Sequence, residues 1–282
     1  MTSPPPTLRA WLREGPFTLT LSAGFFGFFA HAGFIAVLEE EGLTPERLTG
    51  SSAGALVAGL WASGRDAATL REALFSLRRD AFWDPGFGAG LLKGQLFAER
   101  LAELLPVDHF EACRWPLALS VFELARLRTR IIDTGLLNPA IRASCAFPGL
   151  FHPVRVAGRL AIDGGVLDRS GLAAVPSGTR TLYHHLATRS RLRGKLQQLS
   201  GVPQREGLCP IVIEDLPRVG PGALEEGPRA FSIAREALLR ALDAPAPVPV
   251  GSRMRGGETS GTSESSESSE SSEAPSSQPT GS

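Results

Sequence analysis

Two glycines, each two positions from the same serine, constrain the fold of this chain more than any other feature of its sequence. The motif reads Gly50-Ser51-Ser52-Ala53-Gly54, and the run that follows it has good helix-forming character. A sharp turn from a strand into a helix has no room for a Cβ atom two positions before or after its central residue, so both positions require glycine. The motif therefore predicts a short strand that ends near Thr49 and a helix that begins at Ala53.

This placement gives Ser52 a chemical role. The exposed N–H groups and the positive end of the dipole at a helix N-terminus stabilise an alkoxide and the oxyanion it generates. The small side chain of Ala53 lets a substrate carbonyl approach the next N–H. We therefore predict that Ser52 is the nucleophile of a serine acyl hydrolase. The alternatives are that Ser52 is only a helix-capping serine, or that Ser51, which lacks flanking glycines at this spacing, is the reactive hydroxyl.

Hydrophobic periodicity extends the strand–helix alternation along the chain. Alternating strands and helices indicate an α/β fold with a mostly parallel central sheet and helices on both faces. We expect strands at 17–21, 47–49, 117–122, 129–132, 159–162, 181–186 and 211–214, and helices at 30–41, 53–63, 66–79, 95–105, 139–146 and 230–242.

Residues 17–38 contain no Asp, Glu, Lys or Arg, a run long enough to span a bilayer. Gly24, Gly27 and Gly33 interrupt it, its first part alternates with a period of two, and its last part leads into Glu39-Glu40-Glu41-Gly42. Strand, glycine turn and helix describe this run better than a membrane span or a signal peptide.

Composition divides the chain of 282 residues into three parts. Residues 1–15 are Pro-rich and are expected to be flexible, residues 16–248 form the catalytic domain, and residues 249–282 form a disordered Ser/Glu-rich tail. The formal net charge of zero argues against nucleic-acid binding. Three cysteines without a CxxC spacing argue against a disulfide framework or a zinc site, and no motif requires a metal or a cofactor.

Three separated blocks together resemble the patatin-like phospholipase family. They are the glycine-containing run at 21–33, the motif around Ser52, and Ala143-Ser144-Cys145-Ala146-Phe147-Pro148-Gly149 followed by Asp163-Gly164-Gly165. The resemblance covers residues 17–170 and implies a three-layer patatin-like fold. It also implies a Ser-Asp dyad in which Asp163 takes the proton of Ser52 as general base. Asp168 is the nearby alternative base, and a turn aspartate is the structural alternative for Asp163.

The glycine-rich loop departs from the family pattern. The family's Gly-Gly-Gly-x-Arg-Gly aligns with Ala23, Gly24 and Phe25, with Gly27 in place of the arginine and Phe28 in place of the last glycine. We expect the N–H groups of Gly24 and Phe25, with that of Ala53, to form the oxyanion hole, and Gly24 and Gly27 to supply the special backbone conformations. Phe25, Phe26, Phe28 and Phe29 either line an acyl-chain pocket, touch a lipid surface or pack into the core.

The predicted activity is cleavage of lipid carboxylic esters, of a phospholipid or a lysophospholipid, in a cytoplasmic protein that makes at most transient contact with a membrane surface. Two alternatives stay open. One is a catalytically weak or inactive patatin fold that binds lipid or a protein partner. The other is an α/β-hydrolase esterase whose triad adds His184 or His185 to Ser52 and Asp163. The other histidines have no metal-ligand spacing.

Overall fold

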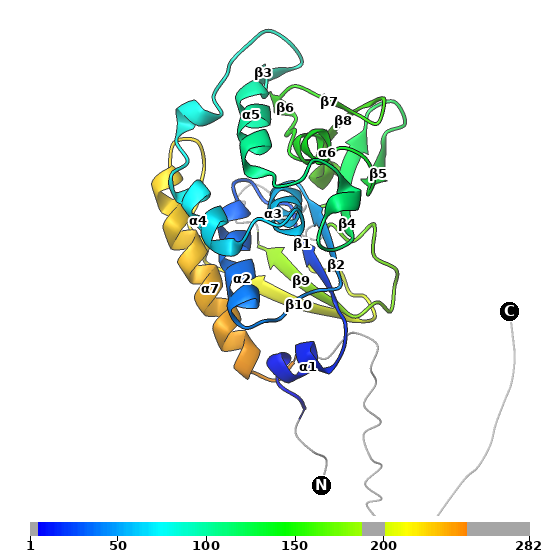
Figure 1. Ribbon diagram of the computed structural model, residues 1–282, viewed down its shortest axis with the longest axis vertical. Helices are drawn as coiled ribbons and strands as arrows, with labels where there is room; N and C mark the ends of the chain where they lie inside the picture. The colour runs from blue at the N-terminus through cyan, green and yellow to red at the C-terminus, as the bar shows by residue number, and fades with distance from the viewer. Residues whose placement is uncertain (1–4, 188–200, 247–282) are drawn as a thin grey trace, which may run out of the picture. The chain divides into compact units, whose positions relative to one another are not determined.

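A computed structural model describes residues 5–187 and 201–246. In these residues a central sheet of eight strands has the order β10-β9-β1-β2-β4-β8-β7, and β5 pairs with the other edge of β4. Strands β10, β9, β1, β2 and β4 are parallel, whereas β5 and β8 pair antiparallel with β4, and β7 pairs antiparallel with β8. Figure 1 shows the helices beside this sheet. The mostly parallel α/β architecture predicted from the sequence is therefore confirmed.

The elements follow one another along the chain in near-regular alternation. The helices are α1 (Leu8–Glu14), α2 (Phe28–Glu40), α3 (Ala53–Ala62), α4 (Ala67–Phe75), α5 (Gln95–Leu104), α6 (Leu137–Ser144) and α7 (Gly227–Asp243). The strands of the main sheet are β1 (Thr18–Leu21), β2 (Arg47–Ser51), β4 (Leu117–Glu123), β5 (Arg128–Ile132), β7 (Val154–Val156), β8 (Arg159–Asp163), β9 (Thr181–Leu186) and β10 (Leu208–Ile213). Strands β3 (Gly90–Leu92) and β6 (Gly149–Phe151) form a separate parallel pair.

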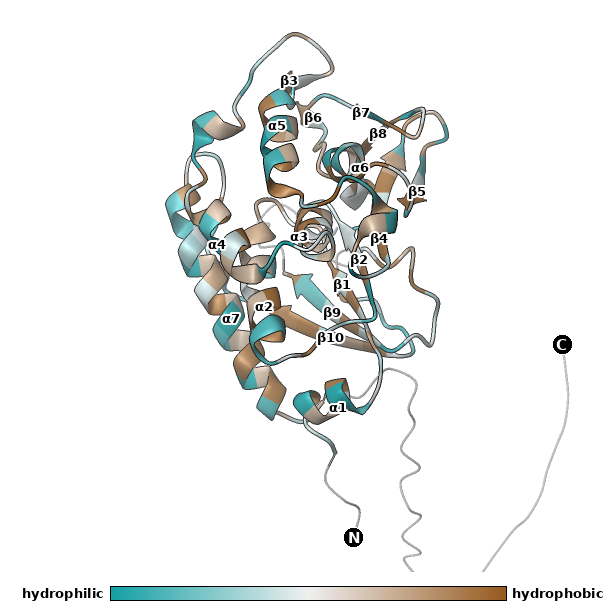
Figure 2. Ribbon diagram, viewed as in Figure 1, coloured by the Kyte–Doolittle hydropathy of each residue, from teal (hydrophilic) through white to brown (hydrophobic). Residues whose placement is uncertain are grey.

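The run at 17–38 forms strand β1, a turn and helix α2, as its glycines indicate. Residues 29–38 of α2 are buried, because α7 packs along this helix. The approach is close at Gly33, where an added Cβ would lie 2.2 Å from the carbonyl oxygen of Phe231. Helix α7 buries one stripe of small and apolar residues, and Figure 2 shows hydrophilic residues on it as well. No helix in the described ranges is long and apolar enough to cross a bilayer.

The two faces of the sheet have different coverings. Alternation along the strands places Leu19, Leu48 and Leu119 on the face that carries the helices. The opposite face carries small polar side chains such as Thr20 and Thr49, whose hydroxyls lie 2.7 Å apart. In the described part of the chain, the segment 168–180 lies against this second face. The Ser120 hydroxyl donates to Asp168, and Leu172 and Val175 pack with Tyr183.

The N-terminal segment differs from the prediction that residues 1–15 are flexible. Residues 8–14 form helix α1 where a flexible segment was expected, and its Leu8, Trp11 and Leu12 are buried. This helix is stabilised from a distance, because the guanidinium of Arg180 stacks over the ring of Trp11 at 3.7 Å. A composition argument cannot detect such a contact. The predicted Ser/Glu-rich tail at 249–282 lies outside the described residues.

Candidate active site

Ser52 lies at the junction between β2 and α3, and its backbone has a conformation that residues other than glycine rarely adopt. Its φ is 52° and its ψ is −120°. Steric contacts explain why glycines stand two positions before and two positions after Ser52. A Cβ at Gly50 would lie 2.6 Å from the carbonyl oxygen of Gly54, and a Cβ at Gly54 would lie 2.1 Å from that of Leu21. The fold therefore holds Ser52 in a strained conformation because its two flanking positions have no side chains.

The structure brings Ser52 and Asp163 together, although 111 residues separate them. The hydroxyl of Ser52 donates a hydrogen bond to Oδ2 of Asp163 at 2.6 Å. Asp163 ends strand β8, and its other oxygen, Oδ1, accepts the N–H of Gly165 at 2.7 Å. A Cβ at Gly164 would lie 2.1 Å from the carbonyl oxygen of Ser120, so glycine lets this turn lie against β4. The predicted pair therefore has the geometry of a nucleophile and its base.

Burial changes the basicity of Asp163. The side chain is only 4% exposed, and the loss of water around the carboxylate raises the pKa of Asp163 from 3.8 to about 6. The hydrogen bonds from Ser52 and Gly165 act in the opposite direction and are weaker. A carboxylate with this pKa is a better proton acceptor near neutral pH than one in water.

The rival candidates have other surroundings. Ser51 is fully buried, whereas Ser52 lines a cavity. Asp168 accepts five hydrogen bonds, from two serine hydroxyls and three backbone N–H groups, and so it organises the loop at 168–173. Its oxygens are thus occupied by the loop and by Ser120, whereas Oδ2 of Asp163 faces Ser52.

The two histidines of the triad alternative point away from this pair. Nδ1 of His184 lies 2.9 Å from Nδ1 of His31, and Nδ1 of His185 lies 2.8 Å from the Tyr183 hydroxyl. His31 also contacts the carbonyl oxygen of Ser22 through Nε2 at 2.8 Å. Burial lowers the pKa of His31 to about 4, so the ring is neutral at physiological pH. The His31 and His184 rings pack α2 against β9. No hydrogen bond joins either β9 histidine to Asp163 within the described ranges.

The loop before α2 differs from the expectation in its conformations. Neither Gly24 nor Gly27 has a positive φ, and the left-handed residue is Phe26, with φ 54°. An added Cβ would lie 2.5 Å from Leu186 Cδ1 at Gly24 and 2.2 Å from it at Gly27, so a side chain at either position would displace the end of the Leu186 side chain. These two glycines thus lie against β9, a contact that a sequence motif does not show.

The three N–H groups expected to form an oxyanion hole belong to residues that line the cavity beside Ser52. Gly24, Phe25 and Ala53 all line the same cavity as Ser52. No intramolecular acceptor is found for these three N–H groups among the described residues. The start of the loop is held in place by a hydrogen bond from the Ala23 N–H to the carbonyl oxygen of Arg169 at 2.7 Å.

Sequence reasoning did not identify two residues at the end of α6 that hydrogen-bond the backbone of Ser52. The Ser52 N–H donates to the hydroxyl of Ser144 at 2.9 Å, and that hydroxyl donates to the carbonyl oxygen of Ser120 at 2.7 Å. The thiol of Cys145 donates to the carbonyl oxygen of Ser52 at 3.2 Å. Both residues belong to the third sequence block, so their position in the motif was the available signal, but nothing in their spacing from Ser52 indicates contact.

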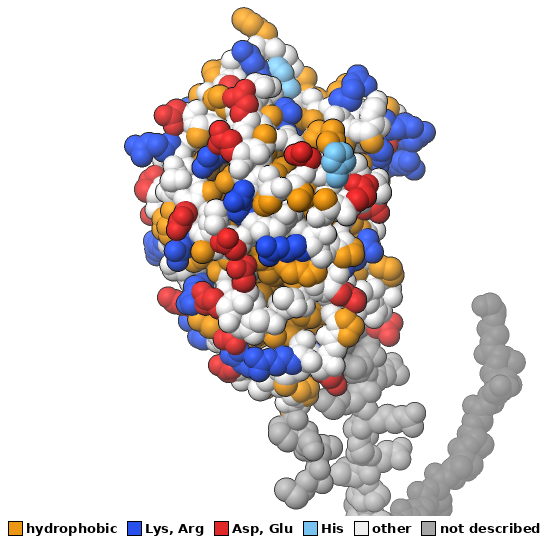
Figure 3. Space-filling view, in the orientation of Figure 1, with side chains coloured by type: hydrophobic (Ala, Val, Ile, Leu, Met, Phe, Trp, Pro, Cys, Tyr) orange, Lys and Arg blue, Asp and Glu red, His pale blue; other side chains and the backbone are white. Residues whose placement is uncertain are grey.

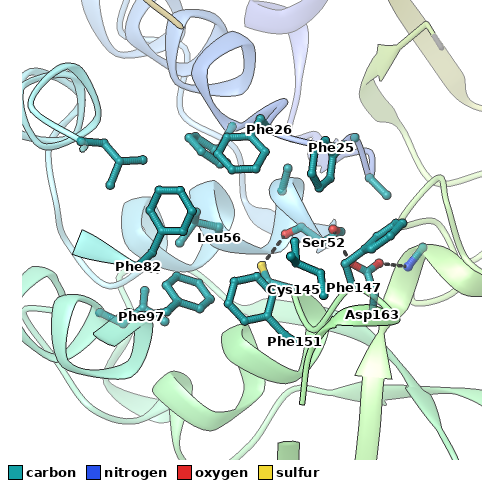
Figure 4. Close-up of a pocket in the computed structure, with 18 of the residues that line it drawn as sticks. Phe25, Phe26, Ser52, Leu56, Phe82, Phe97, Cys145, Phe147, Phe151 and Asp163 are labelled. Carbon is teal, nitrogen blue, oxygen red and sulfur yellow. Dashed lines mark hydrogen bonds between the residues drawn. The ribbon is translucent and has the colours of Figure 1, made fainter. Parts of the chain in front are cut away.

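A cavity of about 530 Å³ opens beside Ser52 and is lined mostly by apolar side chains. Figure 4 shows aromatic rings around it, with Ser52, Cys145 and Asp163 at one side. Three of the four loop phenylalanines, Phe25, Phe26 and Phe28, line this cavity, whereas Phe29 is 1% exposed and belongs to the core. Most of the remaining apolar lining comes from α3, α4, α5, the segment between α4 and β3, and the segment after α6: Leu56, Leu60, Leu74, Leu77, Phe82, Phe97, Leu101, Leu104, Phe147, Leu150 and Phe151.

No cluster of three or more His, Cys, Asp or Glu side chains in the described ranges is arranged to hold a metal ion. All three cysteines are free thiols.

Comparison with known proteins identifies relatives of this arrangement. A family model described as Patatin-like phospholipase matches residues 19–175. An uncharacterized NTE family protein of Mycobacterium tuberculosis is 32% identical over 160 residues, which are 56% of this chain and 44% of that protein. Lysophospholipase nte1 of Emericella nidulans is 25% identical over 162 residues, 55% of this chain and 11% of that protein. The chain thus spans less than half the length of these curated relatives.

A solved structure shares the fold. VipD from Legionella pneumophila superposes with a TM-score of 0.55 at 15% sequence identity, covering 81% of this chain and 67% of that one. At this identity the likeness concerns the fold alone.

Proposed function

The chain belongs to the patatin-like phospholipase family, and from this premise we propose that it is a serine acyl hydrolase that cleaves carboxylic esters of lipids through an acyl-enzyme at Ser52. One observation carries the proposal. The Ser52 hydroxyl lies 2.6 Å from a buried carboxylate at the side of an apolar cavity.

In the first step, Ser52 Oγ attacks the ester carbonyl carbon while its proton passes to Oδ2 of Asp163. The hydrogen bond between these two atoms is the path of that proton. The raised pKa of Asp163, about 6, reduces the energy needed for the transfer. The N–H of Gly165 holds Oδ1 and so fixes the direction in which Oδ2 points.

The tetrahedral intermediate carries a negative oxygen, which needs donors that are already in position. We assign this role to the N–H groups of Ala53, Gly24 and Phe25. Removal of one such donor costs about 10²–10³-fold in rate in well-studied enzymes. Phe25 can serve as well as a glycine, because its φ lies outside the left-handed region and the donor is a backbone group.

Collapse of the intermediate releases the alcohol, which takes the proton from Asp163, and leaves the acyl group on Ser52. A water molecule then attacks the acyl-enzyme, with Asp163 again accepting a proton. The same two side chains thus serve both half-reactions.

The substrate class follows from the cavity. Its apolar lining suits an acyl chain, since each buried methylene contributes about 0.8 kcal/mol to binding. A phospholipid or a lysophospholipid supplies such a chain on a carboxylic ester. The name of the lysophospholipase relative supports this class. Contact with a membrane surface would bring the substrate to Phe25, which is 56% exposed beside the cavity. A cytoplasmic location is part of the same proposal.

Comparison of the wild type with Ser52→Ala and Asp163→Asn on acyl esters and phospholipids tests the proposal. We expect both variants to lose at least about 10³-fold in kcat, and Ser51→Ala, which changes a neighbouring hydroxyl outside the cavity, to keep activity. Activity unchanged in Ser52→Ala would exclude the mechanism.

The altered loop favours one alternative, a patatin fold that binds lipid with weak or no catalysis. The observation behind it is Phe26, a bulky residue with positive φ in the loop that supplies the donors. A fluorophosphonate probe separates the two functions. Covalent labelling of Ser52 supports the hydrolase, and absence of labelling in a folded protein supports the binding protein.

A further inference from the structure

Two hairpins extend the central sheet beyond the point where Ser52 lies. Strand β4 continues past its pairing with β2, which ends at Ser120, and turns into β5. Strands β7 and β8 form the second hairpin, and β8 pairs with the same extension of β4. These hairpins carry five arginines, which we call the arginine surface: Arg126, Arg128, Arg130, Arg155 and Arg159.

The two hairpins form one continuous surface. The Leu124 N–H donates to the carbonyl oxygen of Leu160 at 3.1 Å and so joins the end of β4 to β8. Oε1 of Glu123, whose side chain is fully buried, lies 3.6 Å from Arg126 and 3.0 Å from Arg159. One carboxylate therefore holds an arginine from each hairpin.

Glu123 compensates only part of the positive charge of this surface. Residues 124–132 and 149–162 contain no Asp or Glu. Five positive charges and the negative charge of Glu123 leave a net charge of +4 on a chain whose formal net charge is zero. The side chains of Arg126 and Arg159 are 48% and 41% exposed. Figure 3 shows Lys and Arg side chains gathered over the β5, β7 and β8 corner of the molecule.

Apolar side chains lie among these charges. Leu127, between Arg126 and Arg128 in the first hairpin turn, is 71% exposed, and Leu160 is 42% exposed. A surface that offers guanidinium groups for phosphates and leucines for acyl chains matches the boundary of a lipid bilayer. Nucleic-acid binding would account for the arginines but not for the two exposed leucines.

The arginine surface adjoins the candidate active site through a single strand. Strand β8 begins at Arg159 and ends at Asp163. Four steps along a strand cover about 13 Å. A lipid surface that contacts the hairpins would therefore lie close to the cavity beside Ser52.

We propose that the arginine surface docks the protein on an anionic lipid surface, with phosphate or phosphatidyl headgroups at the guanidinium groups and Leu127 in the interfacial layer. The choice of a lipid partner rests on the proposed function, because docking would bring ester substrate to the cavity. The binding itself does not require hydrolysis, so the two proposals can fail separately.

Co-sedimentation with lipid vesicles tests the docking. The full chain carrying Ser52→Ala is used, so that the vesicles stay intact, with phosphatidylcholine vesicles that contain or lack phosphatidylglycerol. We expect tighter binding to the vesicles with phosphatidylglycerol and a loss of that difference at high salt. Arg126→Gln with Arg128→Gln should weaken this binding roughly 30-fold, since each arginine near a charged membrane contributes about 1 kcal/mol, or about a fivefold factor.

The matched control removes two exposed arginines elsewhere, Arg229→Gln with Arg240→Gln on α7, and should bind like the Ser52→Ala parent. When Ser52 is left unchanged, both double variants should hydrolyse a short-chain soluble ester at the wild-type rate. That result would show that both variants fold. Glycerol phosphate should not displace the protein from vesicles.

Three results would overturn the docking: equal binding to both vesicle types, unchanged binding of the Arg126/Arg128 variant, or an equal loss in the α7 control. Absence of ester hydrolysis together with selective vesicle binding would instead contradict the proposed function and leave the docking supported.

Discussion

Replacement of Asp163 by Asn should remove activity and at the same time stabilise the fold. The carboxylate has a pKa of about 6 in the folded protein against 3.8 in an unfolded chain, because burial disfavours its charge. The native state therefore binds more protons than the unfolded state between these two values, and the free energy of unfolding falls as pH rises through this window. Above pH 6 the ionised side chain opposes folding by about 3 kcal/mol.

Asparagine has the same shape and no charge. Its oxygen can still accept the N–H of Gly165, and its NH₂ group can donate to Ser52. The variant should exceed the wild type in stability by about 1 kcal/mol at about pH 4.5 and by about 3 kcal/mol at about pH 7.5. Urea denaturation at the two pH values measures the difference.

Asp168→Asn provides the control. Asp168 accepts three backbone N–H groups and two hydroxyls, so loss of its charge should destabilise the protein at about pH 7.5. The reasoning is refuted if Asp163→Asn is no more stable than the wild type at this pH, or if its gain is the same at both.

The remaining predictions concern the same site. The kcat/KM of a soluble ester should rise with pH through an apparent pKa of about 6 as Asp163 becomes able to accept a proton, and a profile that stays flat across this value would contradict its role as the base. Leu56→Trp should fill part of the cavity and lower kcat/KM for long acyl chains by about 4-fold for each methylene no longer buried, with little effect on acetyl esters; equal losses on both would argue against an acyl-chain cavity. Gly54→Ala should cost at least about 3 kcal/mol in thermal or urea unfolding because its methyl group would lie 2.1 Å from the Leu21 oxygen, whereas Gly222→Ala, with no atom within 4 Å, should change stability by less than about 0.5 kcal/mol.

Local sequence patterns were sufficient to predict most of the helices and strands. The period-two pattern of β1 and the glycine-bounded run of α3 depend on neighbouring residues, and the strand at 181–186 was found with the bounds that β9 has. Strands β6 and β7 were not predicted, because three residues are too few for a period to be visible. Helix α1 was missed because its stability comes from contacts with β9 and α7.

In the candidate site, too, some features follow from local sequence and others do not. The glycines around Ser52 indicate the turn by themselves, since their requirement is steric and local. Asp163 was singled out through family resemblance, because no local pattern distinguishes it from Asp168. The contact between the Ser52 N–H and Ser144, 92 residues away, could not be predicted for the same reason.

The sequence alone predicts the alternation of strands and helices and the turn at Ser52, because these depend on residues a few positions apart, and three separated blocks indicate the family. The folded chain shows which carboxylate meets the serine, how far burial raises its pKa, and that three phenylalanines line a cavity while the fourth packs in the core. Burial and distance between remote segments are properties of the assembled sheet. The arginine surface is also of this kind, because its charges come from two hairpins that meet only when β8 pairs with β4.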